Sequence, residues 1–177
     1  MTIILKSIIM PFNMSTENNL VESELKELFV KQKLTLAVAE SCAGGLVGHR
    51  ITNIPGSSKY FEMSLVAYSD EVKNKVLGVP IDVLREFGAV SSHVATAMAK
   101  RAKKLAQADV GLGITGIAGP DGGTKEKPVG LVYIAIVMDN KIVCKEYRFD
   151  GQRQDIKNQT AQKALELLRE ILLEITC

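Results

Sequence analysis

Residues 34–52, LTLAVAESCAGGLVGHRIT, decide the fold of this chain. The run from Leu34 to Ala39 is short and apolar, as is typical of a buried strand. It leads into the turn Glu40-Ser-Cys-Ala-Gly-Gly45, after which apolar residues recur at helical spacing and stop before Pro55. Strand, tight turn and helix therefore follow one another directly, which is the local order of an α/β protein.

Helices and strands interleave on both sides of this unit. A helix is expected from Ser15 to Lys33, and an amphipathic helix from Asp155 to Ile175 closes the chain. Between them the patterns predict strands at 63–67 and 109–115, helices at 70–77 and 80–87, a helix capped by Ser91 or Ser92, and a hairpin of strands at 130–138 and 141–149. The hairpin adds an antiparallel pair, so we predict a three-layer α/β/α fold on a mixed sheet.

Length, charge and aromatic content limit the class of protein. The 177 residues correspond to about one domain. We expect that domain at 15–177, with Met1 to Met14 a loose leader or a misassigned start. A net charge of +2 with scattered basic residues, and an aromatic set without Trp, argue against binding nucleic acid. The apolar start is too short to span a bilayer. We therefore expect a cytoplasmic protein with neither membrane nor nucleic acid as partner.

The cysteines and histidines show no pattern of a metal site. Cys42, Cys144 and Cys177 are odd in number and far apart, so neither a disulfide framework nor a zinc site is indicated. His49 and His93 have no ligand partner at a suitable spacing. We expect no metal and no cofactor.

The turn after the first strand carries the strongest sign of chemistry. Ser41 should expose its hydroxyl there, and the N–H groups of Cys42, Ala43 and Gly44 should be unpaired donors at the positive end of a helix dipole. Such donors hold an oxyanion or a phosphate, and Gly44 and Gly45 let a ligand approach the backbone. Two alternatives stay open: Ser41 merely caps the helix, and Cys42 is either a thiolate nucleophile or a small core residue.

A serine nucleophile needs a base. His49 and His93 are poorly placed for this role. Lys73 lies on the first turns of the helix that follows Tyr68, but it acts as a base only if its pKa falls well below its ordinary value of about 10.4. Asp70 would raise that pKa unless it faces solvent. By spacing alone, a solvated Lys73 on an exposed helix face is the simpler interpretation.

The glycine-rich loop at 116–130 matches neither common nucleotide motif. GLGITG, residues 111–116, has the letters of the dinucleotide fingerprint, but its first glycines lie in a strand pattern and Pro120 follows where a helix is required. The spacing of a Walker A loop is also absent. The region is either a plain connection or a set of groups for an anion, namely Thr115, Thr124, Lys125 and Lys127.

Several motifs occur in the order and spacing of one known family. They are AESCAGG (39–45), PGSSKYF (55–61), AYSDEVK (67–73), GAVS (88–91), TGIAGPDGG (115–123), KPVGLVY (127–133) and FDGQR (149–153). From about Leu20 to Leu173 the chain resembles the C-terminal domain of the competence/damage-inducible protein CinA. Stand-alone versions of that domain are nicotinamide-nucleotide amidases of the PncC type.

This resemblance implies an activity and a role for individual residues. Members hydrolyse the carboxamide of nicotinamide mononucleotide to nicotinate mononucleotide and ammonia, without a metal. By motif, Ser41 would be the nucleophile, Lys73 its base or proton shuttle, and Tyr68 an orienting or relaying partner. The substrate-binding set would be Cys42, Ala43, Gly44, Gly45, Thr115, Gly116 and Arg153, with Arg153 suited to grip the phosphate. The resemblance also implies an oligomer, which we expect to be a homodimer.

The chain departs from the family pattern at three positions. It has Ala43 where Thr is usual, Asp70 where Asn is usual, and Ser64 near a common Gly. Ala43 removes one possible donor from the pocket wall, and an Asp70 that faces Lys73 would hold that lysine protonated. These departures favour an alternative hypothesis, a non-catalytic nucleotide-binding or regulatory module. A thiol amidase that uses Cys42 is a third hypothesis.

Overall fold

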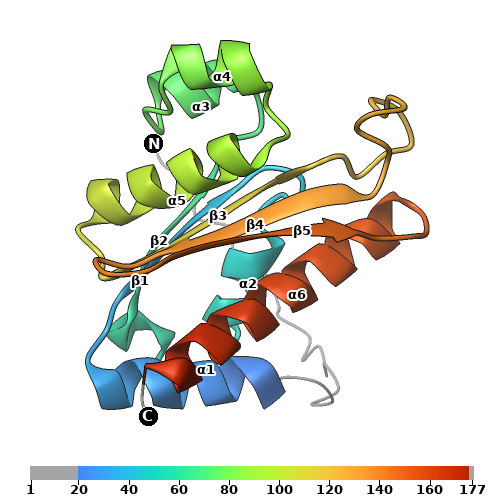
Figure 1. Ribbon diagram of the computed structural model, residues 1–177. Coiled ribbons are helices and arrows are strands. Elements are labelled where there is room, and N and C mark those ends of the chain that lie inside the picture. Colours follow the sequence, from blue (N-terminus) through green and yellow to red (C-terminus); the bar gives the residue numbers. More distant parts are fainter. Residues whose placement is uncertain (1–19, 176–177) are drawn as a thin grey trace, which may run out of the picture.

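A computed structural model describes residues 20–175, so the expected leader at 1–14 and the residues 15–19 of the first expected helix lie outside it. The elements in chain order are α1 (Leu20–Gln32), β1 (Leu36–Glu40), α2 (Leu46–Thr52), the 3-10 helix η1 (Ser57–Lys59), β2 (Phe61–Val66), α3 (Asp70–Lys75), α4 (Ile81–Phe87), α5 (Ser92–Ala106), β3 (Val110–Gly116), β4 (Leu131–Val137), β5 (Ile142–Arg148) and α6 (Arg153–Glu174). Every helix and strand that the sequence predicts within this range is present (Figure 1).

The sheet is mixed, and helices cover both of its faces. Its strand order is β2-β1-β3-β4-β5, with β1 parallel to β2 and β3, and β4 antiparallel to β3 and β5. The helices α1, α2 and α6 lie on one face, and α5, with α3 and α4 beyond it, lies on the other (Figure 1). The predicted three-layer α/β/α class with a mixed sheet is therefore confirmed.

Strand β1 divides the core between the two faces. All its residues are buried, which suits a strand covered on both sides. Leu36 and Val38 pack with apolar residues of α1, α2 and α6, whereas Ala37 and Ala39 pack with those of α5. Larger side chains on one side and alanines on the other allow α5 to lie closer to the sheet.

Two glycines of β3 allow this close approach. A Cβ at Gly111 would lie 2.1 Å from the Ala99 carbonyl oxygen, and a Cβ at Gly113 would lie 2.2 Å from that of Ala95. The backbone of α5 thus rests almost directly on β3. The letters GLGITG therefore serve helix-to-sheet packing, which explains why a fingerprint-like motif occurs inside a strand.

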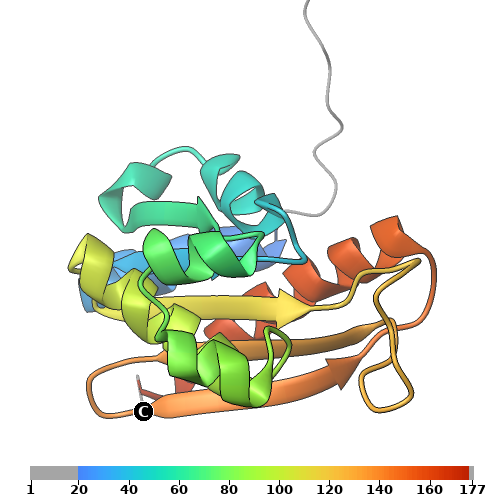
Figure 2. The same cartoon turned by 90° about the horizontal axis from the view of Figure 1, so that it is seen from above.

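The topology brings three strand ends to one edge of the sheet. In Figure 2 the arrowheads of β2 and β3 point to the same side, and β1 between them runs in the same direction. Ser41 directly follows β1, Gly116 ends β3, and Tyr68 follows β2 by two residues. Open α/β sheets bind ligands at the carboxyl ends of their parallel strands. The expected functional residues lie at that edge.

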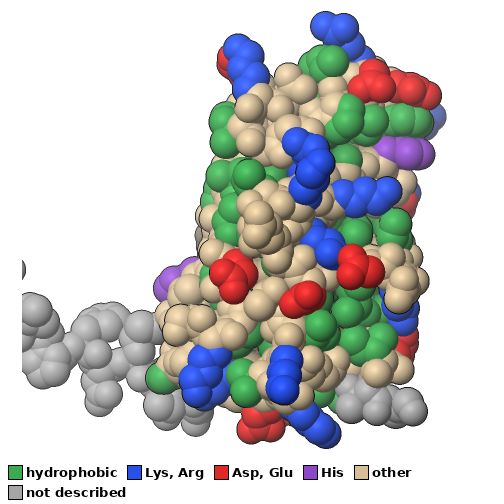
Figure 3. All heavy atoms as spheres, turned by 90° about the vertical axis from the view of Figure 1, so that its left-hand side faces the viewer, with side chains coloured by type: hydrophobic (Ala, Val, Ile, Leu, Met, Phe, Trp, Pro, Cys, Tyr) green, Lys and Arg blue, Asp and Glu red, His purple; other side chains and the backbone are tan. Residues whose placement is uncertain are grey.

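Charge is dispersed over one face of the molecule. Lys, Arg, Asp and Glu side chains are interspersed over the face shown in Figure 3. Within residues 20–175, no helix is long and apolar enough to cross a membrane.

Candidate functional site

A small pocket lies at this edge of the sheet and gathers most of the predicted site residues. Its volume is about 170 Å³. The residues that line it are Ser41, Cys42, Tyr68, Asp70, Lys73, Ala89, Val90, Thr115, Gly116, Ala118 and Arg153. Residues from three strand ends and from the starts of α3 and α6 therefore meet in one cavity.

Ser41 sits in a turn that is tied to the neighbouring strand. Its side chain is buried apart from 7% of the residue surface. Its N–H donates to the Ile114 carbonyl at 3.0 Å, and its own carbonyl accepts from the Gly44 N–H at 3.1 Å. Within residues 20–175 the Ser41 hydroxyl has no hydrogen-bond partner and lines the pocket. This hydroxyl is free to act on a ligand rather than to cap α2.

Lys73 is buried, which contradicts the simpler interpretation of a solvated lysine. Only 2% of it is exposed, and its Nζ donates to the Tyr68 carbonyl at 3.1 Å. Burial lowers the pKa of Lys73, while the Asp70 carboxylate, 3.5 Å away, acts in the opposite direction. Because the Asp70 side chain is 62% exposed, solvent screens its effect. Burial therefore shifts the pKa of Lys73 in the direction that a lysine base requires.

Tyr68 and Arg153 form one rim of the pocket. Tyr68 is exposed, and its hydroxyl oxygen accepts from Arg153 Nη2 at 2.8 Å. Arg153 Nη1 donates to the Gly119 carbonyl at 2.6 Å. The guanidinium therefore links α6 to Tyr68, which lies just beyond β2, and to the glycine-rich loop. Its contacts are to a hydroxyl and a carbonyl, and no acidic residue of the described chain pairs with it.

Cys42 is a core thiol rather than a thiolate. Burial raises the pKa of Cys42 from 9.0 to about 12, and this effect outweighs the opposing contribution of the N–H groups of Cys42 and Ala43. The expectation that a helix start favours the thiolate is wrong here, because desolvation dominates. The structure therefore disfavours the thiol amidase hypothesis.

The donors expected at the helix start are largely occupied. Helix α2 begins at Leu46, directly after the turn, and the N–H groups of Gly45, Val47 and Gly48 donate to the buried carboxylate of Glu40 at 2.9, 3.2 and 2.9 Å. The N–H of Gly44 donates to Ser41. The prediction of unpaired donors is therefore wrong for Gly44. In the described chain the N–H groups of Cys42 and Ala43 have no carbonyl or carboxylate acceptor, but both approach the Cys42 sulfur.

Several other candidates have structural partners. The Thr115 hydroxyl donates to the Ala89 carbonyl at 2.8 Å, which ties β3 to the segment before α5. Lys127 donates to the Phe87 carbonyl at 2.8 Å, so it is not freely available to an anion as expected. His93 stacks on Phe87 with ring centroids 3.7 Å apart. His49 approaches Asn53, and neither histidine lines the pocket.

Sequence reasoning missed two residues near the turn. Glu40 precedes Ser41, and an acid at a strand end just before a helix start is the signal that would have found it. Lys157 lies one helical turn after Arg153, and a Cβ at Gly44 would be 3.4 Å from its Nζ. Within residues 20–175 no hydrogen bond or ion pair engages this amine. No three His, Cys, Asp or Glu side chains of that range cluster as metal ligands.

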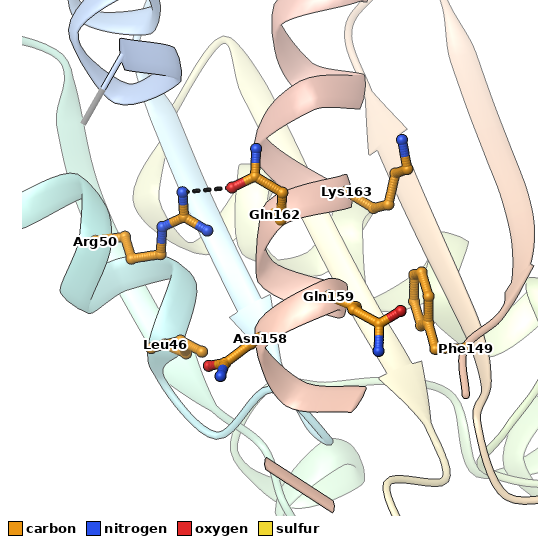
Figure 4. A pocket seen from close by; sticks show the side chains of 7 residues that line it. All are labelled: Leu46, Arg50, Phe149, Asn158, Gln159, Gln162 and Lys163. Carbon is orange, nitrogen blue, oxygen red and sulfur yellow. Dashed lines mark hydrogen bonds between the residues drawn. The ribbon is translucent and has the colours of Figure 1, made fainter. Parts of the chain in front are cut away.

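A larger hollow lies elsewhere, between α2 and α6, but it offers less chemistry. It measures about 540 Å³ and is lined by Leu46, Arg50, Phe149, Asn158, Gln159, Gln162 and Lys163 (Figure 4). Arg50 already donates to Gln162 and to the buried Glu22. Lys163 pairs with Glu166 at 2.6 Å. The smaller pocket, with Ser41 and Lys73, is the better candidate active site.

Fold and site together define a three-layer α/β protein with a serine and a buried lysine at the carboxyl ends of parallel strands. The comparisons with known proteins narrow this class. Residues 18–172 match the family model of the CinA C-terminal domain, and the chain belongs to that family.

Relatives and solved structures agree with this assignment. The chain is 50% identical over 156 residues to a CinA-like protein of Geobacter sulfurreducens, covering 88% of this chain and 38% of the relative. A CinA-like protein of Geotalea uraniireducens is also 50% identical, with 88% of this chain and 37% of the relative covered. The chain thus spans well under half of these curated relatives.

The matches to solved structures extend over nearly the whole length of those chains. The competence/damage inducible protein CihA from Agrobacterium tumefaciens is 38% identical with a TM-score of 0.81, covering 88% of this chain and 97% of its own. A competence or damage-inducible protein from Enterobacter asburiae is 30% identical with a TM-score of 0.84, covering 87% and 97%.

Proposed function

We propose that the protein is an amidohydrolase that converts nicotinamide mononucleotide to nicotinate mononucleotide and ammonia. The observation that carries this proposal is that Ser41 and the buried Lys73, whose pKa is lowered by burial, line the same pocket. A lysine without its proton is a base strong enough to activate a serine hydroxyl. The resemblance to PncC-type amidases supplies the substrate.

The reaction proceeds in two half-reactions. Ser41 Oγ attacks the carboxamide carbon while its proton passes to the Lys73 amine. The tetrahedral oxyanion is stabilised by the N–H groups of Cys42 and Ala43, the turn donors that carry no carbonyl or carboxylate partner. The C–N bond then breaks, and Lys73 returns the proton to the departing ammonia. An acyl ester on Ser41 remains.

Water completes the cycle. It attacks the ester carbon, Lys73 accepts one of its protons, and the ester C–O bond breaks to release the carboxylic acid, which loses its proton to solvent to give the carboxylate. The proton on Lys73 then returns to the Ser41 oxygen. Tyr68, whose carbonyl holds the Lys73 amine, orients this base and also holds Arg153 through its hydroxyl.

The size of the pocket supports a binding mode in which only one end of the substrate is enclosed. At about 170 Å³ it is smaller than the typical range of about 300–1,000 Å³ for ligand sites. It therefore encloses the carboxamide end, while ribose and phosphate lie at the rim beside Arg153. In this arrangement a few individual groups hold the phosphate, because a protein with a net charge of +2 has no large excess of positive charge to attract it.

Ammonia release tests the proposal. The purified protein is incubated with nicotinamide mononucleotide, and ammonia is measured for the wild type and for Ser41→Ala. Release by the wild type that Ser41→Ala abolishes supports the proposal. Equal release by both proteins, or by neither, contradicts it.

One observation favours a second candidate function, a nucleotide-binding module without catalysis. The Asp70 carboxylate approaches Lys73 at 3.5 Å and raises its pKa, which opposes the role of base. Calorimetry that shows tight binding of the nucleotide, together with no ammonia release, would favour this candidate over the amidase.

A further inference from the structure

Glu40 is a buried carboxylate that takes no part in the proposed chemistry. It ends β1, directly before the proposed nucleophile, and its side chain is fully buried. Its Oε2 accepts from the N–H groups of Gly45 and Val47, and its Oε1 accepts from the Gly48 N–H and from the Ser64 hydroxyl at 3.1 Å. All four partners donate, so both oxygens of Glu40 act as acceptors.

This carboxylate bridges the two ends of the nucleophile turn. Glu40 belongs to the strand before the turn, and its backbone donors belong to the start of the helix after it. The first N–H groups of a helix lack intrahelical partners and attract negative charge. Inside the turn, Gly44 and Gly45 have φ values of +67° and +91°, so no side chain stiffens the backbone there. The turn depends on anchors at its ends.

The packing around Glu40 is close enough to fix its position. A Cβ at Gly48 would lie 2.7 Å from the Ser64 Oγ and 3.6 Å from Glu40 Oε1. A glycine at 48 therefore lets α2 approach β2, and Ser64 of β2 then reaches the same carboxylate. Helix and edge strand are joined through one side chain.

We propose that Glu40 is a positioning residue for Ser41. It occupies the anion position at the start of α2 and holds the 41–45 turn in the conformation that directs the hydroxyl into the pocket. The inference deepens the proposed function and rests on it for its kinetic readout. Substrate anions are excluded from the start of α2 for the same reason.

Glu40→Gln removes the charge at nearly constant volume. One amide group cannot accept from both pairs of donors, because its nitrogen faces either the Gly45 and Val47 pair or the Gly48 and Ser64 pair. The turn loses part of its anchor. Since a misplacement of about 1 Å costs on the order of 100-fold, we expect kcat to fall by about 10- to 100-fold and KM to stay within about twofold.

Glu22→Gln is the matched control. Glu22 is equally buried, and its Oε1 pairs with Arg50 at 2.6 Å, but unlike Glu40 it accepts from none of the N–H groups of residues 45, 47 and 48. The Glu22→Gln variant should be less stable than the wild type, but its kcat should stay within about threefold of the wild-type value. If Glu40→Gln does not fold, Ser64→Ala replaces it: loss of one hydrogen bond to a carboxylate should lower kcat by about two- to fivefold.

The experiment measures ammonia kinetics and amide hydrogen exchange on the same proteins. Glu40→Gln should speed exchange at residues 45, 47 and 48 while leaving α1 and β3 protected. The proposal is overturned if Glu40→Gln keeps the wild-type kcat, if Glu22→Gln loses as much, or if exchange rises equally throughout the chain. If the wild type releases no ammonia, the proposed function fails, and the local exchange result alone decides whether Glu40 holds the turn.

Discussion

Replacement of Lys73 by methionine should separate activity from stability. Lys73→Met keeps a long unbranched side chain but removes the amine that we propose as the base. General-base catalysis contributes about 100- to 10,000-fold, so kcat should fall by that factor, equivalent to about 2.7–5.4 kcal/mol. Ammonia release under saturating nucleotide measures this loss.

The stability change should be small because two effects oppose each other. The variant leaves the Tyr68 carbonyl without the Lys73 Nζ donor that lies 3.1 Å from it, at a cost of about 1–3 kcal/mol. It also removes an amine that is only 2% exposed and whose burial as a cation costs several kcal/mol. With a net change within about 2 kcal/mol, Tm should shift by at most about 8 °C. Thermal unfolding followed by circular dichroism measures it.

The pH dependence of stability tests the cost of burying the Lys73 amine as a cation. Burial lowers the pKa of Lys73 from 10.5, so between the lowered pKa and 10.5 the unfolded chain binds more protons than the folded one. Stability contributed by this group rises with pH through that window. The stability of Lys73→Met relative to the wild type should therefore be greatest below the window and should decline towards pH 10.5. A variant that keeps kcat within threefold, or that loses activity only in proportion to unfolding, would refute the reasoning.

Three further substitutions test neighbouring features. Asp70→Asn removes the carboxylate that raises the pKa of Lys73, so the acid limb of the pH–rate profile should move to lower pH, with about 1.5- to 5-fold more activity on that limb. An unchanged profile would contradict this contact. Cys42→Ala should keep kcat within about threefold, because the pKa of this thiol is raised to about 12 and a thiolate is absent near neutral pH. Loss of ammonia release would revive the thiol hypothesis. Gly113→Ala should destabilise the fold by about 1–3 kcal/mol, because its Cβ would meet the Ala95 carbonyl at 2.2 Å, and the denaturation midpoint measures this.

The fold was predictable because local patterns and the global arrangement agree. The apolar run before Ser41 becomes β1, and the hairpin at 130–149 becomes the antiparallel strands β4 and β5. Boundaries differ by a few residues. Helix α6 starts at Arg153 rather than Asp155, since a capping box of Gln152 and Asp155 begins it earlier than the apolar stripe indicates.

The direction of the pKa shifts of Lys73 and Cys42 could not be predicted from the spacing of residues in the sequence. Lys73 lies on a short polar helix, yet it is buried and its Nζ donates to the Tyr68 carbonyl, which the sequence pattern does not encode. The same limit applies to Cys42. A helix-start rule favours its thiolate, but desolvation by burial moves its pKa in the opposite direction.

The residues in and beside the glycine-rich loop show a related limit. Lys127 and Thr115 have the composition of an anion site, yet their side chains bond to backbone carbonyls at Phe87 and Ala89. The last carbonyls of a helix and the carbonyls of a loop lack partners from regular structure, so polar side chains from elsewhere satisfy them. Whether a lysine serves a ligand or a carbonyl depends on which segments the fold brings together.

The two cations at the start of α6 differ in how freely they can meet a phosphate in the proposed reaction. Arg153 already donates to the Tyr68 hydroxyl and to the Gly119 carbonyl, so binding a phosphate with the same N–H groups would break the rim of the pocket. Lys157 lies one turn further, beside the exposed Gly44, and no acceptor in the described chain engages it. Under the proposed function we therefore expect Arg153 to shape the pocket and Lys157 to meet the phosphate without the loss of an existing contact.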